Sequence, residues 1–445
     1  MMNRQPHGPL GRPVPPARPS HPVWPGVLVL FVMVGSWPAD TFAQTAFTWQ
    51  QIRSRFEAAN PTLQADQIGI DESKANEITA FLRPNPQFGM TADQIGHNDQ
   101  GKPFADTITV LAVGYLHERQ HKRELRQESA QKATGIAVSG HADLDRTLVF
   151  TLRGAFVQVL TSKAALALAQ DNLKFYDQLL TISRDRLRTG DIAQIDLDRL
   201  ELLRVQLEAA EQTADVNLRT AKIQLLMLLN DRTPIDQFDV TGPFDFADVT
   251  PTLADLRQTA LDTRPDLRVA LQAIDKAQTD HRLAIANGST DPVFTVDAGF
   301  PILSEIWQSY TVPLREYVGL NVSVPLRLFD RNQGEKLRTQ LDINRTQRLT
   351  DAARAQVFND VDSAYATLAS TLILLKPYKD RYLAQATRVR DTITYSYQRG
   401  GAALLDFLQA EQDYRSVQIN YVSLVGSYLA AAAQLNLAVG QEVIP

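Results

Sequence analysis

The second half of this chain repeats the first half. Five residues recur at a constant offset of 210 positions: Gly190, Asp196, Glu201, Ala221 and Leu225 match Gly400, Asp406, Glu411, Ala431 and Leu435. A period of about 200 residues is far too long for the stacked units of a solenoid. The sequence therefore predicts two structural repeats, residues 44–250 and residues 251–445, each of them one large supersecondary unit.

Residues 1–43 have the pattern of a secretory signal peptide. Three arginines precede an apolar run at residues 27–34, and small residues follow at Thr41 and Ala43. This order of basic, apolar and small residues predicts export with cleavage after Ala43. The chain has no cysteine, so its stability must come from burial and assembly rather than from disulfides.

The charge of the remaining chain argues against a nucleic-acid partner. Without the leader the chain has 42 basic and 49 acidic residues, a formal charge of −7. No face or tract is strongly basic, as a nucleic-acid-binding surface would need to be. Seven histidines and five methionines form no dense group, so we expect no metal site and no cofactor.

A short helical stretch is predicted over residues 49–82. Each repeat also contains a long helical hairpin, predicted over about 119–229 and about 334–439, and the second hairpin begins with one helix over about 334–398. Residues 119–189 contain no proline and would form a helix about 100 Å long. The returning helix has apolar residues three and four apart: Leu200, Leu203, Leu207, Ala210, Ala214, Leu218, Ala221, Leu225 and Leu228. That spacing is typical of a coiled-coil seam. In the second hairpin we expect a kink at Pro377.

Each repeat also contains two segments that resemble β-strands, at about 87–95, 106–117, 293–300 and 316–328. In the last segment, Leu320, Val322, Val324 and Leu326 alternate with Asn321, Ser323, Pro325 and Arg327. The segments are near the length of a tilted strand that crosses a membrane. Four strands cannot close a barrel, so a membrane location requires several chains to share one. Two soluble hairpins that cap the helices are the alternative.

Several motifs give the whole mature chain a resemblance to the TolC-type outer-membrane efflux factors. They are Asn60-Pro61-x-Leu63, Pro84-Asn85-Pro86-x-Phe88, the run from Val324 to Gly334, and the turns Arg186-Leu187-x-x-Gly190 and Tyr397-x-x-Gly400. The chain looks most like the outer-membrane component of cobalt–zinc–cadmium-type heavy-metal efflux systems. The resemblance implies a mainly α fold with a small β part, in which long coiled-coil hairpins in two tandem repeats extend from a trimeric 12-stranded outer-membrane barrel, four strands per chain.

The function that this resemblance implies is a passive channel-tunnel in the outer membrane with its tunnel in the periplasm. A homotrimer, embedded in outer-membrane lipid, would carry solutes, heavy-metal cations among them, from an inner-membrane pump of the resistance-nodulation-division type and a periplasmic adaptor to the exterior. It would not be an enzyme. Substrate identity cannot be predicted from the sequence, because a wide aqueous tunnel imposes little selectivity.

The resemblance also points to site residues at the two hairpin turns. Asp196 and Asp406 lie six residues beyond a turn glycine and are candidates for the tunnel gate, although Gln409 occupies the position of a second gating acid. An ordinary solvated aspartate at a helix start is the alternative for both. Candidates for contact with the adaptor are Arg186, Leu187, Gly190, Tyr397 and Gly400.

Two rival functions follow from other features. A periplasmic coiled-coil adaptor is the first, although one helical hairpin flanked by β domains would be usual there. A zinc metallopeptidase is the second, because His117-Glu118-Arg119-Gln120-His121 spells H-E-x-x-H. In a peptidase this spacing places both imidazoles on one helical face. A polar collar between barrel and tunnel is the simpler interpretation of that segment.

Overall fold

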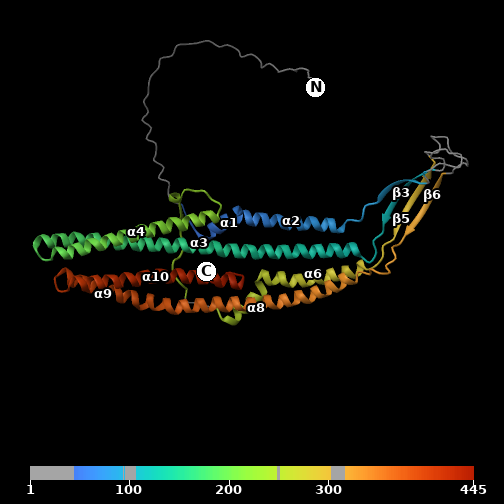
Figure 1. The fold of residues 1–445 in the computed structure, drawn as a ribbon. Coiled ribbons are helices and arrows are strands. Elements are labelled where there is room, and N and C mark those ends of the chain that lie inside the picture. Colours follow the sequence, from blue (N-terminus) through green and yellow to red (C-terminus); the bar gives the residue numbers. More distant parts are fainter. Residues whose placement is uncertain (1–44, 94, 96–106, 248–250, 302–315, 445) are drawn as a thin grey trace, which may run out of the picture. The chain divides into compact units, whose positions relative to one another are not determined.

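The computed structural model describes residues 45–93, 95, 107–247, 251–301 and 316–444. The predicted signal peptide, residues 97–103 between the first two predicted strands, and positions 94 and 106 of those strands therefore lie outside the described residues. Figure 1 shows long helices joined at one end to a small sheet.

A core order of two helices, two strands and a helical hairpin occurs twice among the described elements, while β1, β4 and the 3-10 turn belong to the first series alone. The first series is β1 (Thr45–Phe47), α1 (Trp49–Ala59), α2 (Pro61–Phe81), β2 (Gln87–Asp93), β3 (Ile108–Leu116), α3 (Lys122–Thr189), α4 (Gln194–Leu228), a 3-10 turn (Ile235–Gln237) and β4 (Phe238–Val240). The second is α5 (Leu253–Thr263), α6 (Pro265–Asn287), β5 (Val293–Phe300), β6 (Tyr317–Ser323), α8 (Gln333–Pro377), a π-helical turn η2 (Tyr378–Tyr382), α9 (Leu383–Gln398) and α10 (Leu404–Val439).

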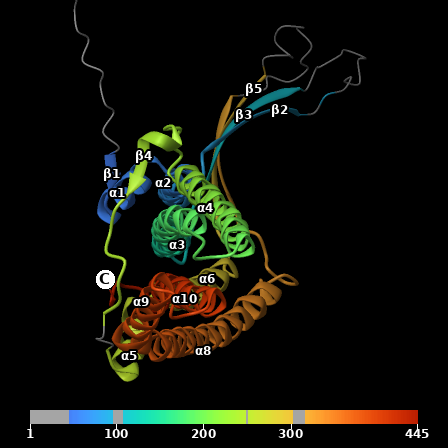
Figure 2. The ribbon, with the colours of Figure 1, turned by 90° about the vertical axis from the view of Figure 1, so that its left-hand side faces the viewer.

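The two helical hairpins lie side by side, and α3 packs against α10 between them. Figure 2, which looks along the hairpins, shows α3 and α10 facing each other between α4 and α8. The predicted apolar seam of α4 faces α3, and Leu200 and Leu225 are fully buried there. Near the turns, a hydrophobic cluster joins the hairpins through residues such as Tyr176, Leu200 and Phe407. Helix α4 has its main contacts with α3 alone, so it forms one edge of this layer.

The helical stretch predicted over residues 49–82 is two helices, not one. The backbone of Asn60 is extended, and its side chain accepts hydrogen bonds from the amides of Thr62 and Leu63 at 2.9 and 3.1 Å. Pro61 causes this break because proline disfavours the helical conformation in the residue before it. Pro265 separates α5 from α6 in the same way at the matching place in the second series.

The helix predicted across residues 334–398 is also interrupted. Pro377 is the last residue of α8, and residues 378–382 continue as a π-helical turn before α9 begins. Because proline has no backbone N–H, the regular hydrogen-bond ladder cannot pass through it. A π-turn is one of the recognised places where a long helix changes direction.

The four longer strands form one antiparallel sheet in the order β2-β3-β5-β6. The central pair, β3 and β5, joins the two halves of the chain. Strand β6 is shorter than predicted, since it ends at Ser323, which pairs with Val293, the first residue of β5. Residues beyond Ser323 have no partner in β5, and Pro325 could not donate to one. Strands β1 and β4 form a separate parallel pair.

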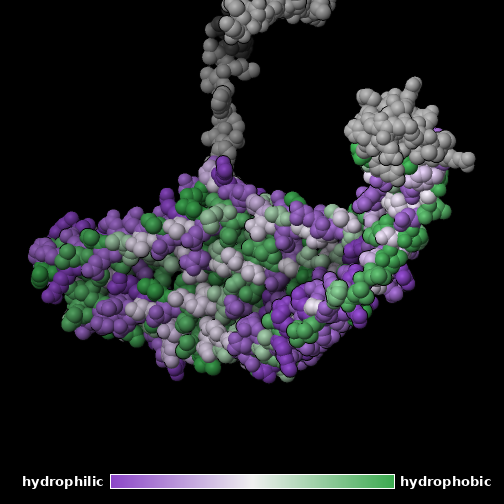
Figure 3. All heavy atoms as spheres, turned by 45° about the vertical axis from the view of Figure 1, so that its right-hand side comes forward, coloured by the Kyte–Doolittle hydropathy of each residue, from purple (hydrophilic) through white to green (hydrophobic). Residues whose placement is uncertain are grey.

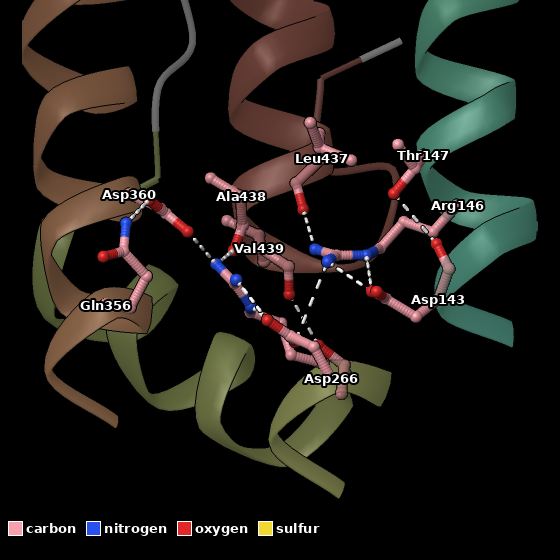
Figure 4. A network of polar contacts seen from close by, with 11 residues as sticks. Asp143, Arg146, Thr147, Asp266, Gln356, Asp360, Leu437, Ala438 and Val439 are labelled. Atoms are coloured by element: carbon pink, nitrogen blue, oxygen red, sulfur yellow. Dashed lines mark hydrogen bonds and ion pairs between the residues drawn. The ribbon is translucent and has the colours of Figure 1, made fainter. Parts of the chain in front are cut away.

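The carboxyl end of α10 is held by side chains from three other elements, an arrangement that we call the clamp (Figure 4). Three side chains donate hydrogen bonds to backbone carbonyl oxygens of α10: Arg146 to Leu437 O at 2.5 Å, Arg264 to Ala438 O at 3.1 Å and Thr263 to Val439 O at 2.6 Å. Arg264 also pairs with Asp266 at 2.6 Å and with Asp360 at 2.9 Å. Cations near these carbonyls oppose the negative end of the helix dipole. The clamp therefore joins α3, α5, α6, α8 and α10.

Candidate functional site

One face of the four-stranded sheet is apolar in nearly every cross-strand row, with Thr109, between Ala92 and Phe300, as the polar exception. Phe88, Val113, Val296 and Leu320 form one row, and Met90, Leu111, Ala298 and Val318 form the next. Tyr115, Phe294 and Val322 continue the face toward the helices. Leu320 is 84% exposed and Val318 is 76% exposed, so nothing in the described chain covers this face. Figure 3 shows hydrophobic residues gathered along the sheet.

The opposite face is more polar and richer in glycine, and its large side chains lie toward the two ends of the sheet, Tyr317 at one end and Leu116 at the other. Its rows are Gln87, Gly114, Thr295 and Asn321, then Gly89, Ala112, Asp297 and Gly319, then Thr91, Val110, Gly299 and Tyr317. An apolar outer face and a polar inner face are the signature of a barrel wall in a membrane. The register therefore favours the membrane interpretation of the strands over two soluble caps.

Among the described residues, the strand at each sheet edge has no partner on its outer side, β2 at one edge and β6 at the other. Backbone groups that lack partners are not tolerated in lipid. The sheet must therefore be continued by strands of other copies of the chain before it can lie in a membrane.

The turns of the two hairpins have the same geometry. Gly190 and Gly400 adopt φ angles of 81° and 77°, a left-handed conformation that favours glycine. In the first turn the amide of Asp191 donates to Arg186 O at 2.9 Å, and in the second the amide of Gly401 donates to Ser396 O at 2.9 Å. This is the Schellman pattern of a helix end. Both glycines are exposed.

The gate candidates Asp196 and Asp406 lie in the first turns of α4 and α10. Asp406 is exposed and Asp196 is half-buried. Both carboxylates lie where the positive end of the helix dipole favours a negative charge. This placement agrees with either role predicted for them, so their function at the gate stays a prediction.

Two of the adaptor-contact candidates contact each other. Arg186, at the end of α3, donates to the carbonyl oxygen of Tyr397 at 3.0 Å, and its guanidinium lies 5.3 Å from the centroid of the Tyr397 ring. The Tyr397 ring stacks on Phe407 at 5.0 Å and is only 5% exposed. The ring of Tyr397 thus belongs to the contact between the hairpins, and Leu187 packs partly against the same cluster, while Gly190 and Gly400 are exposed.

The H-E-x-x-H segment does not form the helix that a zinc peptidase requires. Gln120 and His121 have left-handed backbones, and α3 begins only after them. His117 packs edge-on against the Phe294 ring, and Glu118 forms a two-pronged pair with Arg126. The histidines therefore do not share a helical face. No group of three potential metal ligands occurs among the residues that the structure describes.

Glu411 is a site residue that the sequence did not single out. It is 2% exposed in α10, and its Oε1 atom has no hydrogen-bond partner in the described chain. Burial raises the pKa of Glu411 to about 7, although the positive charges of Arg390 and Arg415 oppose the rise. The hydroxyl of Tyr176, on α3, is likewise buried without a partner. An unsatisfied buried carboxyl of this kind often marks a functional or strained place.

A second exposed apolar row lies on α4, the edge helix. Ile195, Leu202, Val216 and Ile223 are exposed and share a spacing of seven or fourteen residues. A heptad row is the surface by which one helix packs on another. No helix within the described chain covers it.

Comparison with known proteins agrees with this geometry. Residues 256–441 match the sequence model of the outer membrane efflux protein family. The chain is 24% identical to the cobalt-zinc-cadmium resistance protein CzcC of Cupriavidus metallidurans over 92% of this chain and 93% of CzcC. Among solved structures, CusC gives a TM-score of 0.74 at 18% identity, covering 88% of this chain and 92% of CusC.

A second solved structure gives a similar result. The open state of the MtrE outer membrane channel of Neisseria gonorrhoeae superposes with a TM-score of 0.71 at 18% identity, covering 89% of each chain. The shared fold includes the sheet as well as the hairpins, since nearly the whole described chain is covered.

Proposed function

The chain belongs to the outer membrane efflux protein family, and on that premise we propose that it is the trimeric outer-membrane conduit through which heavy-metal cations leave the cell. The channel works with a periplasmic adaptor and an inner-membrane pump. The observation that carries the channel role is the sheet, whose faces are divided into apolar and polar rows and whose two edges are open. The cation substrate rests on the full-length likeness to CzcC.

Three copies complete the barrel. Each chain supplies four strands, and β6 of one copy pairs with β2 of the next to close a ring of 12 strands. A heterologous contact of this kind closes after a fixed number of copies. In the tunnel, the exposed row Ile195, Leu202, Val216 and Ile223 packs against the neighbouring copy, because α4 is the edge helix of its own chain.

The hairpin turns form the periplasmic end. We assign gating to Asp196 and Asp406, whose six copies in a trimer would repel one another and attract cations. The exposed turns at Gly190 and Gly400 meet the adaptor, together with the half-buried Leu187. Arg186 and Tyr397 hold the two hairpins together, and their contact must loosen if the hairpins separate.

A metal-tolerance assay tests the substrate. A host that carries the cognate pump and adaptor but lacks this chain should regain tolerance to cobalt, zinc and cadmium when the chain is supplied. Leu320→Arg is a suitable negative control because it places a charge on the lipid face, which should cost about 2 kcal/mol or more of insertion energy. Restored export of an organic drug without any change in metal tolerance would contradict the cation proposal.

A separate experiment tests the channel itself. Purified mature protein should require detergent, run as a trimer and conduct ions in planar bilayers. Asp406→Ala should increase the conductance, and Arg123→Ala is a matched control that removes a charge far from the turns. A mature protein that stays monomeric and water-soluble without detergent would refute the channel.

A further inference from the structure

The four membrane strands carry only two charged residues, and both are acidic. They are Asp93, at the last position of β2, and Asp297, in the middle of β5. Strands β3 and β6 carry no charge within their described bounds. A charge placed within a membrane strand is costly unless it faces water, so its position is informative.

The register places Asp297 on the polar face. Asp297 pairs with Ala112 on one side and with Gly319 on the other, and Gly89 completes the row. Its sequence neighbours Val296 and Ala298 lie on the apolar face. In the closed barrel the carboxylate therefore faces the lumen, in a row whose other three residues are glycine or alanine.

Gly319 keeps the space around this carboxylate open. A Cβ atom at position 319 would lie 2.6 Å from Asp297 Oδ2, so any other residue there would displace the acid. Two pairs further along, in the next row of the same face, the Tyr317 ring covers Gly299. No ion pair or hydrogen bond joins Asp297 to another residue in the described part of the chain, and no basic residue lies in the strands to neutralise it.

We propose that Asp297 sets a cation preference in the barrel lumen, through a ring of three carboxylates contributed by the three copies. This inference rests on the proposed function, because only a closed trimeric barrel brings the three carboxylates around one lumen. It adds a selectivity element at the exterior side of the channel, separate from the aspartates of the periplasmic turns.

The size of the lumen decides how strong the preference is. Twelve strands about 4.8 Å apart and tilted by about 40° give a barrel radius of about 12 Å. An aspartate reaches a few ångströms inward, so each carboxylate lies about 9 Å from the axis, estimated from the same spacings. The Debye length is about 10 Å at 0.1 M salt, about 30 Å at 0.01 M and about 3 Å at 1 M. The carboxylates therefore act across the whole lumen only in dilute salt.

The test is the reversal potential of the full trimer in planar bilayers under a potassium chloride gradient. The measurements are made in an Asp196→Ala, Asp406→Ala background, which removes the acids of the turns. Asp297→Asn should lower the cation-to-anion permeability ratio by about two-fold or more near 0.01 M salt and leave it unchanged near 1 M. Asp297→Glu, which keeps the charge, is the matched control.

A second variant, which adds a charge, tests the inference even if the Asp297→Asn protein does not fold. Asn321→Asp adds a carboxylate to the same face one row away and should raise the permeability ratio. If the trimer conducts and Asp297→Asn and Asn321→Asp both leave the ratio unchanged in dilute salt, the inference is wrong while the channel stands. If the trimer does not conduct at all, the channel proposal fails, and this inference fails with it.

Discussion

Glu201 and Glu411 occupy the same position in the two halves of the chain, yet their surroundings are opposite. Glu201 lies on α4, half-exposed, and pairs with Arg184 at 2.9 Å. Glu411 lies on α10, almost completely buried, with one carboxyl oxygen unpaired and a pKa raised to about 7. The two glutamates differ because α4 lies at the edge of the helical layer, whereas α10 is covered by α3, α8 and α9. The repeat preserves the residue and its helix, and the neighbouring helices decide its chemistry.

The largest expected difference between matched positions is at the two proline breaks. Arg264→Ala removes the donor to Asp266, Asp360 and the Ala438 carbonyl, and should lower the free energy of unfolding by about 3–5 kcal/mol. Asn60→Ala, at the matching break, removes only a helix cap and should cost about 1 kcal/mol. Denaturant unfolding in detergent measures both. Equal losses would show that the clamp adds little beyond a cap.

The second prediction concerns pH. Burial raises the pKa of Glu411 in the folded chain from 4.5 to about 7, so the folded state favours the protonated carboxyl. The stability of the fold is therefore highest below about pH 4.5 with respect to this group, and it decreases as the pH rises through 7 and the buried carboxyl ionises. Glu411→Gln should therefore unfold like the wild type near pH 4 and be more stable by about 2–3 kcal/mol near pH 9. Glu201→Gln should change stability by less than about 0.5 kcal/mol at either pH. A wild-type-like pH profile for Glu411→Gln would contradict this assignment.

The third prediction is that equivalent substitutions at the two hairpin turns cause equal losses of stability. Gly190→Ala and Gly400→Ala each place a side chain on a left-handed backbone, and nothing lies within 4 Å of either new Cβ. Each substitution should cost about 1 kcal/mol, from backbone strain alone. Hydrogen exchange of the amides at each turn measures the local loss. A clear difference between the two variants would mean that the turns are not equivalent in the assembled channel.

The smallest effect is expected at the edge helix. Arg184→Ala removes the partner of Glu201 in an ion pair whose two side chains are about half-exposed. Such a pair contributes less than about 0.5 kcal/mol, and less again at high salt. Thermal unfolding at low and at high ionic strength checks this. A loss above 1 kcal/mol would indicate that the neighbouring subunit buries this pair.

The long elements were predictable because they follow simple periodicities. The alternation of Leu320 with Asn321, the seam through Leu200 and Leu225, and the turn glycines mark strands and hairpins in the sequence itself. The break at Asn60-Pro61 had the same kind of local signal, a helix cap followed by proline, although it was assigned to a continuous helix.

Other features depend on residues far apart in the chain. The burial of Glu411 requires α3 and α9 to lie against α10, and the contact of Arg186 with Tyr397 joins residues of the two separate hairpins. The H-E-x-x-H spacing suggested a zinc site on one helical face, but His121 has a left-handed backbone just before the helix begins. The gate and adaptor roles of the turn residues depend on other copies and partners, so they stay predictions.

The short parallel pair of β1 and β4 determines which part of the chain can complete its folding late. Thr45 pairs with Phe238, so this contact can form only after nearly two hundred further residues have followed Thr45. Closing so long a loop is slow compared with forming a helix. Until β4 is available, β1 lacks its partner strand, and proteases and chaperones have access to the amino-terminal segment.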